Sequence, residues 1–343
     1  MARRAQNRKV IYLLLAVALL QSAAIVGLLF ALDTAGPQEG EAVSAPADPV
    51  EEDTVMPAWL EPVPEKPASE EPAQEKEPPE GALSASDILA SSQVIAHGLG
   101  GIGGETILNC REAFLAQYEN GVRVFEADLR LTKDMQVVLR HDWRSGWQEG
   151  VSETDIPTLE EFLDKPILEE YTPLSFRDLL LLMEEYPDVC VVTDTKFTDA
   201  EIVTLQFEAM LADARDLGLS YLFDRMVIQV YSELNYRIVD SIHHFPHYIY
   251  TLYAEGFDRT EDTFRAKAAF CQENGIMGVT MWDYWWREDF APIALEYGVS
   301  VYAHTVNDPD QALSLLDSGV GAVYSDSLVP SDLSRGPDME EGA

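Results

Sequence analysis

The chain has 343 residues, and 47% of them are hydrophobic, which is enough for a sizeable core and excludes a globally disordered protein. Its 60 acidic residues outnumber 23 Lys and Arg, so the formal charge is −37. That charge excludes the simplest nucleic-acid binders, which need a cationic face, and argues against electrostatic docking on anionic lipids. Three scattered cysteines are too few for a disulfide framework or a structural zinc site.

The N-terminal region predicts a membrane anchor. Residues 1–9 form a basic tail, and residues 10–32 contain no charged side chain. A helix of that length spans about 35 Å, enough for the ~30 Å hydrocarbon core of a bilayer. The positive flank predicts a cytoplasmic N-terminus, so a single span in the cell membrane would hold the rest of the chain on the extracytoplasmic side. The alternative is a signal peptide cleaved near residues 22–24, which exports the same domain.

Residues 33–85 predict a disordered, acidic, proline-rich linker. Ten of the 19 prolines lie between residues 37 and 80, where the formal charge is −11. Such a stretch cannot bury enough apolar surface to offset its ordering entropy. Subtracting this −11 and the +3 that precedes it from −37 leaves −29 on residues 81–343. We expect a folded domain over residues 86–335 and a short disordered tail over residues 336–343.

Short apolar segments alternate with amphipathic helical stretches through the folded part, which is typical of α/β architecture. The expected strands are 93–97, 123–131, 136–141, 189–196, 226–230, 248–253, 277–281, 300–305 and 322–326. The expected helices are 110–120, 175–185, 199–217, 232–243, 263–274 and 309–318. About 245 residues with this alternation predict a (β/α)8 TIM barrel. Residues 131–135 are too few for a helix and predict a hairpin turn, so we expect a distorted barrel with one of the nine strands outside it.

Two carboxylates stand two residues apart on the second expected strand. Glu126 and Asp128 point to the same side of the strand, whereas Phe125 and Leu129 take the other. Two anions side by side repel each other unless a cation or a shared proton lies between them. Because both faces of an inner barrel strand are buried, the pattern favours a site for a hard metal ion over a solvent-facing charged stripe.

Further candidates stand where other strands end, which is the end of a TIM barrel that carries its chemistry. His97 and His141 would supply an acid and a base near neutral pH, although a single histidine at a strand end is more often structural. Asp194 and Lys196 share a strand face, either as a structural ion pair or as a third carboxylate beside a phosphate-binding lysine. Trp282 begins a run of three tryptophans, which predicts either core packing or a substrate-facing aromatic rim.

Taken in order, these motifs resemble the glycerophosphodiester phosphodiesterase family, and in particular its bacterial phospholipase C-like branch. The resemblance covers residues 93–330 and rests on His97, Glu126-x-Asp128, His141-Asp142, Asp194-x-Lys196 and Thr305-Val306-Asn307. It implies a TIM barrel in which Glu126, Asp128 and Asp194 hold one divalent cation, Ca2+ or Mg2+. It also implies that His97 and His141 act as acid and base and that Lys196 contacts the phosphate. A neighbouring hydroxyl of the substrate would attack first, giving a cyclic phosphate that water then opens.

The implied function is metal-dependent hydrolysis of glycerophosphodiesters or related phospholipid headgroup phosphodiesters by two-histidine acid–base catalysis. The expected partners are a small-molecule phosphodiester and, through the N-terminal helix, the membrane, with no nucleic acid and no obligate protein partner. One alternative is a phosphoinositide phospholipase C-like lyase that stops at the cyclic phosphate. Another is a catalytically weakened barrel that binds phosphodiester polymers.

The sequence departs from the family pattern at four positions. Gly98 stands where the family usually has an arginine, so a bidentate phosphate contact is lost. An arginine restored there is expected to tighten phosphate binding if the loop has room. Leu108 replaces the glutamate of a Pro-Glu-Asn motif, Asp194 replaces a commoner glutamate, and His304 replaces a tryptophan.

Overall fold

The computed structural model describes residues 73–144, 152 and 154–334, and nine strands lie within that part of the chain. They are β1 (Val94–Ala96), β2 (Val124–Leu131), β3 (Val137–Leu139), β4 (Cys190–Asp194), β5 (Met226–Val230), β6 (Tyr248–Thr251), β7 (Gly278–Trp282), β8 (Ser300–His304) and β9 (Ala322–Ser325). All nine predicted strands are present, and no end differs from its prediction by more than about two residues.

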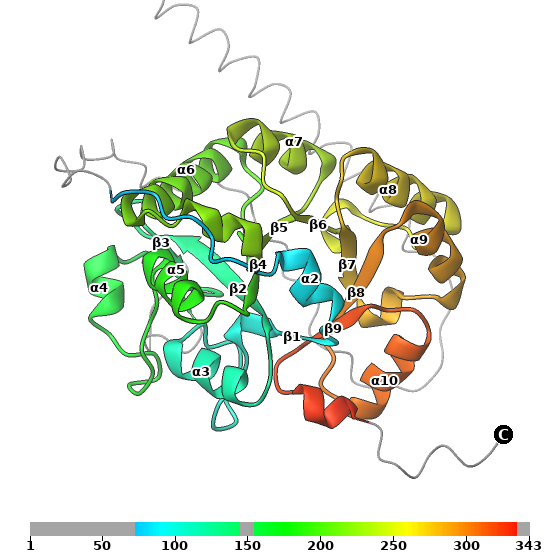
Figure 1. The fold of residues 1–343 in the computed structure, drawn as a ribbon, viewed down its shortest axis with the longest axis horizontal. Coiled ribbons are helices and arrows are strands. Elements are labelled where there is room, and N and C mark those ends of the chain that lie inside the picture. Colours follow the sequence, from blue (N-terminus) through cyan, green and yellow to red (C-terminus); the bar gives the residue numbers. More distant parts are fainter. Residues whose placement is uncertain (1–72, 145–151, 153, 335–343) are drawn as a thin grey trace, which may run out of the picture. The chain divides into compact units, whose positions relative to one another are not determined.

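Eight of these strands are parallel and close into a barrel. Hydrogen-bonded neighbours follow the order β1, β2, β4, β5, β6, β7, β8 and β9, and β9 pairs again with β1. The remaining strand, β3, is antiparallel to β2 and lies outside the ring. Helices surround the strands in Figure 1. The prediction of a distorted (β/α)8 barrel is confirmed, including the hairpin and the extra strand.

The outer helices are amphipathic segments, and several of them begin at polar caps. They are α3 (Arg111–Glu119), α5 (Phe176–Glu185), α6 (Ala200–Leu217), α7 (Glu233–Ile242), α8 (Glu261–Glu273), α9 (Ala291–Tyr297) and α10 (Pro309–Asp317). Side chains of Ser175, Ser232 and Asp308 accept the amide hydrogen three residues ahead and so fix three of the starts. Two further helices are α2 (Ala85–Ala90) and α4 (Leu159–Leu163). The sequence did not predict α2, α4 or α9, because none exceeds seven residues and such helices show little periodicity.

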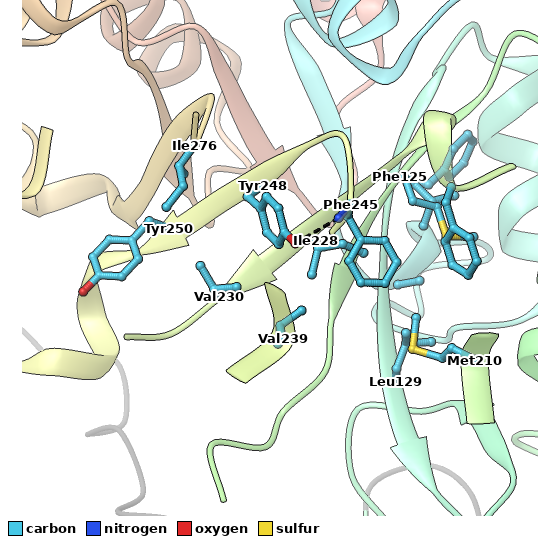
Figure 2. Packing of buried hydrophobic residues seen from close by; sticks show 14 of the residues in the cluster. Phe125, Leu129, Met210, Ile228, Val230, Val239, Phe245, Tyr248, Tyr250 and Ile276 are labelled. Carbon is cyan, nitrogen blue, oxygen red and sulfur yellow. Dashed lines mark hydrogen bonds between the residues drawn. The ribbon is translucent and has the colours of Figure 1, made fainter. Parts of the chain in front are cut away.

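Alternate side chains of the barrel strands point into the barrel or toward the helices. On β2, Val124 packs inside with Val192 of β4, whereas Phe125 packs in the outer layer. Figure 2 shows part of this outer layer, where the Tyr248 hydroxyl oxygen accepts a 3.0 Å hydrogen bond from the Phe245 amide. Full burial of a large apolar side chain contributes roughly 1.5–3 kcal/mol, so this layer fixes the strands that carry the candidate site.

Helix α2 closes the barrel at the end where the strands begin. The Ser84 hydroxyl accepts from the Asp87 amide at 3.2 Å, and the Asp87 carboxylate accepts from the Ser84 amide at 3.1 Å, which forms a capping box. Ile88 and Leu89 then pack on the inner residues of the barrel. Figure 1 shows α2 crossing the centre of the ring of strands. The opposite end, where the parallel strands end, is termed the mouth.

The predicted linker is ordered where it meets the barrel. Residues 73–84 belong to the predicted linker 33–85, yet residues 73–76 lie against the end of α6 and the loop after it. The Lys76 amide donates to the Gly218 carbonyl at 2.9 Å. Gly218 has φ +67°, and a side chain there would collide with the Gln74 carbonyl. Backbone hydrogen bonds and a glycine without a side chain therefore dock a stretch whose composition predicted disorder.

No helix in the described part of the chain has the length and apolarity needed to cross a bilayer. The basic tail over residues 1–9, the anchor over residues 10–32 and the tail over residues 336–343 lie outside the described residues. Those three assignments stay predictions.

The β2–β3 hairpin determines how a candidate histidine reaches the mouth. The first five residues of β2 pair with β4, and the last of these pairs joins Asp128 to Asp194. The final three residues of β2 continue past β4 and pair with β3, which returns antiparallel. The Arg140 amide then donates to the Asp128 carbonyl at 2.9 Å. The returning chain therefore arrives beside the acidic residues just before His141.

Candidate active site

Three carboxylates meet at the mouth. Glu126, Asp128 and Asp194 are buried, and each offers an oxygen that lies within 4.8 Å of the other two. The register explains this convergence, because Asp128 and Asp194 are direct partners across β2 and β4, and Glu126 lies two residues earlier on the same face. The structure thus brings together the three residues predicted as metal ligands.

Lys196 lies within this carboxylate cluster. Its Nζ is 2.7 Å from Asp128 Oδ1 and 2.6 Å from Asp194 Oδ2. The Lys196 backbone has a φ of 60°, in the left-handed region that few residues other than glycine adopt. Its amide donates to the Tyr231 hydroxyl oxygen at 3.2 Å, and that hydroxyl donates to Asp194. The predicted ion pair between Asp194 and Lys196 exists, and the same ammonium also reaches Asp128.

Two groups from the segment after β1 bind two further oxygens of the carboxylate cluster. The Gly98 amide donates to Glu126 Oε2 at 2.6 Å. Asn109 is fully buried, and its Nδ2 donates to Asp128 Oδ2 at 2.6 Å while its Oδ1 accepts from the Asp128 amide at 3.0 Å. Hydrogen bonds to a carboxylate are strong and directional, so both acids are fixed in orientation.

Burial and neighbouring charges shift the pKa values of the clustered residues in different directions. Burial, followed by the charge of Asp128, raises the pKa of Glu126 to about 8. Burial opposes ionisation of Asp128 too, but the ammonium of Lys196 and the charges of His141 and His97 together outweigh it and lower the pKa of Asp128 far below its ordinary value. Burial disfavours charged Lys196, yet the charges of Asp128 and Asp194 raise its pKa. One lysine therefore offsets only part of the negative charge, and Glu126 is left needing a further cation or a proton.

His97 directly follows β1 and is held by a carboxylate at the end of β9. His97 Nδ1 lies 2.7 Å from Asp326 Oδ1. Asp326 Oδ2 accepts from Asn307 Nδ2 at 2.7 Å, and Asn307 Oδ1 accepts from the Asp326 amide at 2.8 Å. Burial alone would lower the pKa of His97, but the Asp326 hydrogen bond and the charges of Glu126 and Asp128 raise it to about 9. His97 is therefore protonated at neutral pH.

His141 follows β3 and also has its own carboxylate. His141 Nδ1 lies 3.0 Å from Asp142 Oδ2, and Asp142 Oδ1 accepts from the Arg144 amide at 2.9 Å. The His141 side chain is 44% exposed, whereas that of His97 is 17% exposed. In both histidines a carboxylate occupies Nδ1, so Nε2 is the nitrogen left for a substrate.

Aromatic rings lie at the ends of β6, β7 and β8. The ring of Trp282 stacks on His304 with centroids 4.6 Å apart and lies 5.0 Å from the ring of Tyr253. Burial lowers the pKa of His304 to about 3, so this histidine is neutral. Burial, with the charges of Asp194 and Glu126, raises the pKa of Tyr253 well above its ordinary value. The aromatic group therefore borders the carboxylate cluster.

The other two tryptophans of the same segment pack away from the mouth. Trp285 lies 5.9 Å from Phe257 beside the outer core, and Trp286 Nε1 donates to Ser318 Oγ at 2.8 Å. Core packing thus describes Trp285 and Trp286, whereas Trp282 lies at the strand end beside His304.

An arginine does not fit at position 98, so the condition on which tighter phosphate binding was expected is not met. Gly98 has φ +54°, and a Cβ there would lie 2.7 Å from Ile107 Cα and 3.2 Å from Asn109 Nδ2. Contacts this short are steric conflicts with the main chain and with the side-chain amide that binds Asp128. A side chain at position 98 would displace Asn109 before it could reach a phosphate.

Residues 101–329 match the model of the Glycerophosphoryl diester phosphodiesterase family. The chain belongs to this family. It is accordingly an enzyme of the phosphoric diester hydrolase class, as the motifs implied. No protein among the curated sequences matches the chain.

Solved structures with the same fold come from several bacteria. An Oleispira antarctica phosphodiesterase in complex with the product sn-glycerol-3-phosphate is 17% identical, with a TM-score of 0.58 over 73% of this chain and 99% of that one. A glycerophosphodiester phosphodiesterase from Parabacteroides distasonis is 16% identical, with a TM-score of 0.53 over 68% and 92%. Another from Agrobacterium tumefaciens is 14% identical, with a TM-score of 0.52 over 69% and 96%. At such identities the likeness establishes a shared fold.

Three residues of the site were missed by sequence reasoning. Asp326 and Tyr231 each directly follow a barrel strand, so the strand-end rule that selected His97 would have found them if applied to every strand. Asn109 gave a weaker signal, as the last residue of the segment that replaces Pro-Glu-Asn. No pattern in the sequence revealed that its side chain would bond to Asp128.

Proposed function

We propose that this enzyme hydrolyses glycerophosphodiesters, or related phospholipid headgroup phosphodiesters, with one divalent cation and two histidines. The observation that carries the proposal is the group of three buried carboxylates within 4.8 Å at the mouth of a barrel of this family. Both histidines act electrostatically on one of these carboxylates, because the charges of His141 and His97 contribute to lowering the pKa of Asp128. The carboxylates and the histidines therefore lie close enough for their charges to interact, which supports the proposal.

The donor set fits a hard divalent cation. Ca2+ and Mg2+ prefer oxygen ligands at about 2.0–2.6 Å, so two ligands of one ion are at most about 5 Å apart. The oxygens of Glu126, Asp128 and Asp194 meet that limit, and the raised pKa of Glu126 reflects its burial and then the negative charge of its neighbours. A cation held there would supply charge neutralisation to the phosphate oxygens. We propose Ca2+ or Mg2+ because the set contains no sulfur or imidazole ligand.

The two histidines would divide the proton transfers. Protonated His97, with Nδ1 bound to Asp326, is suited to donate a proton from Nε2 to the leaving oxygen. His141, with Nδ1 bound to Asp142, is suited to accept the proton of the attacking hydroxyl. Lys196 would bind the phosphate from inside the cluster, and Trp282 would border the substrate at the rim.

The proposal is tested by incubating the full-length protein with glycerophosphocholine, glycerophosphoethanolamine, glycerophosphoglycerol and glycerophosphoinositol, with Ca2+, with Mg2+ or with EDTA. Phosphorus NMR distinguishes the products. Conversion to sn-glycerol 3-phosphate that EDTA abolishes is the expected result. Accumulation of a cyclic phosphate would favour the lyase alternative. Binding without turnover of any diester would favour the weakened barrel, which Gly98 in place of an arginine motivates.

The same proposal includes export and anchoring by residues 10–32, with the barrel on the extracytoplasmic side. It is supported by the length of the uncharged run and the basic residues before it. Protease treatment of intact cells, compared with lysed cells, tests the orientation of the barrel. N-terminal sequencing of the purified protein separates an intact anchor from a cleaved signal peptide.

A further inference from the structure

Two buried arginines stand on the β2–β3 hairpin beside the mouth. Arg130 is 8% exposed and Arg140 is 3% exposed. Both donate to main-chain carbonyls of the turn that carries the second histidine: Arg130 Nε to the His141 oxygen at 2.9 Å, and Arg140 Nε to the Asp142 oxygen at 2.7 Å. A buried guanidinium must have its hydrogen bonds satisfied, and here a bond from each arginine goes to consecutive peptide groups of one turn.

We propose that Arg130 and Arg140 are positioning residues that hold His141 at the mouth through its main chain. This inference rests on the proposed function, because it assigns the arginines a role only through His141. They would act without contacting the substrate.

The turn needs such support because the regular ladder ends before it. β3 ends at Leu139, and the bond from the Arg140 amide to the Asp128 carbonyl extends the pairing by one step. Within the described residues, His141 makes no backbone-to-backbone hydrogen bond. The bond from its ring to Asp142 joins sequence neighbours, so it orients the ring without fixing the turn relative to the barrel.

Arg130 also links this turn to the turn that carries the lysine of the cluster. Its Cζ lies 5.9 Å from the centroid of the Phe197 ring, and Phe197 directly follows Lys196. The Arg130 guanidinium thus packs on the turn that follows Lys196 and donates to the turn of His141. A lysine keeps the charge but has neither the Nε–H donor nor the flat surface. An Arg→Lys substitution therefore removes the positioning contacts while it keeps the charge.

The competing role for two arginines at such a site is direct binding of phosphate. The two roles predict different kinetics. A phosphate ligand stabilises the bound substrate, so its loss raises KM and weakens product binding. A positioning residue affects proton transfer, so its loss lowers kcat, and an error of about 1 Å in a catalytic group can reduce the rate up to 10²-fold.

The test compares full-length Arg130→Lys and Arg140→Lys with the matched control Arg123→Lys. Arg123 immediately precedes the same strand β2, but its Nε binds Asp188 at 2.7 Å, at the end away from the mouth. With sn-glycero-3-phosphocholine, each hairpin variant should lose roughly tenfold or more in kcat. KM, and the inhibition constant of sn-glycerol 3-phosphate, should change by less than about threefold, and Arg123→Lys should behave as wild type.

A double-mutant cycle with His141→Ala supplies a readout that general destabilisation would not produce. If the arginines act through His141, Arg130→Lys should cause no further loss in the His141→Ala background. Additive losses, or a raised KM with unchanged kcat, would overturn the inference. A melting scan accompanies each variant. If Arg140→Lys fails to fold, Arg130→Lys still tests the inference, because Arg130 donates to the carbonyl of His141 itself. A wild-type protein that is inactive on every diester would refute the proposed function instead.

Discussion

The two histidines of the mouth reach it by different routes. His97 directly follows β1, and the pairing of Ala96 with Ser325 on β9 places Asp326 beside it. His141 arrives on β3, outside the closed barrel, and arginine side chains hold its turn. The first histidine is 17% exposed and the second is 44% exposed.

The difference shows two ways in which a barrel can position catalytic groups. At a strand end, the register that builds the sheet also brings neighbouring side chains together, so the supporting carboxylate comes from the adjacent strand. On a hairpin outside the ring, the sheet fixes the chain only as far as residue 140, and side chains must do the rest. We therefore expect the His97 side to depend on Asp326 and its charge, and the His141 side to depend on buried donors to the main chain.

The largest loss of turnover is expected for Asp128→Ala, because Asp128 contacts both of the segments that carry a histidine. Its carboxylate binds Lys196 and Asn109, and its carbonyl accepts from the Arg140 amide. Loss of this carboxylate should reduce turnover about 10³-fold or more and remove binding of Ca2+ or Mg2+, measured by titration calorimetry. Asp188→Ala, at the far end of the barrel, is the control. Undiminished cation binding in Asp128→Ala would exclude the carboxylate cluster as the metal site.

The next largest loss of turnover is expected for substitution of either histidine. His97→Ala and His141→Ala should each lose about 10²–10⁴-fold in kcat, the usual contribution of a general acid or base. Added imidazole should restore part of the activity of His141→Ala, because that position is open to solvent, and much less of the activity of His97→Ala. Initial rates measured at increasing imidazole concentration provide the measurement. Equal rescue of both variants would contradict the proposed difference in access.

The sequence was sufficient to predict most of the barrel, because period-two and helical patterns reflect local burial that each segment shows by itself. The same reasoning placed Glu126 and Asp128 on one face, since strand geometry alone decides that. It could not predict the partners of Lys196, Asn109 or Asp326, which depend on side-chain reach across the closed ring. It also judged the linker by composition, whereas residues 73–76 are docked through backbone hydrogen bonds, which composition does not report.

A smaller effect is expected for Asp326→Asn, which keeps an oxygen acceptor beside His97 but removes the charge. The pKa of His97 should then fall from about 9 toward its ordinary 6.5. If protonated His97 donates to the leaving oxygen, the alkaline limb of kcat/KM should move to lower pH by as much as the pKa falls, so the loss should grow from about pH 8 to pH 9. The same pKa shift affects stability. Because the pKa of His97 is higher in the folded state, the stability that protonated His97 contributes is complete below about pH 6.5 and is lost as the pH rises through about 9.

The control for this experiment is the other histidine. Asp142→Asn should leave the alkaline limb in place, because the Asp142 carboxylate pairs with His141 and not with His97. An alkaline limb that moves in Asp142→Asn and stays in Asp326→Asn would reverse the acid and base assignments.

The smallest expected effect concerns the charge of the whole domain. Residues 81–343 carry −29, so an anionic substrate approaches against repulsion that salt screens over about 10 Å at 0.1 M. Between about 20 and 200 mM salt at saturating metal, kcat/KM for glycerophosphoglycerol should rise a few-fold. The zwitterionic glycerophosphocholine is the matched control and should respond less. A steep fall with salt would require a cationic funnel. Arg130 and Arg140 would be its nearest source, although both already donate to the turn of His141, so the same result would also weaken their assignment as positioning residues.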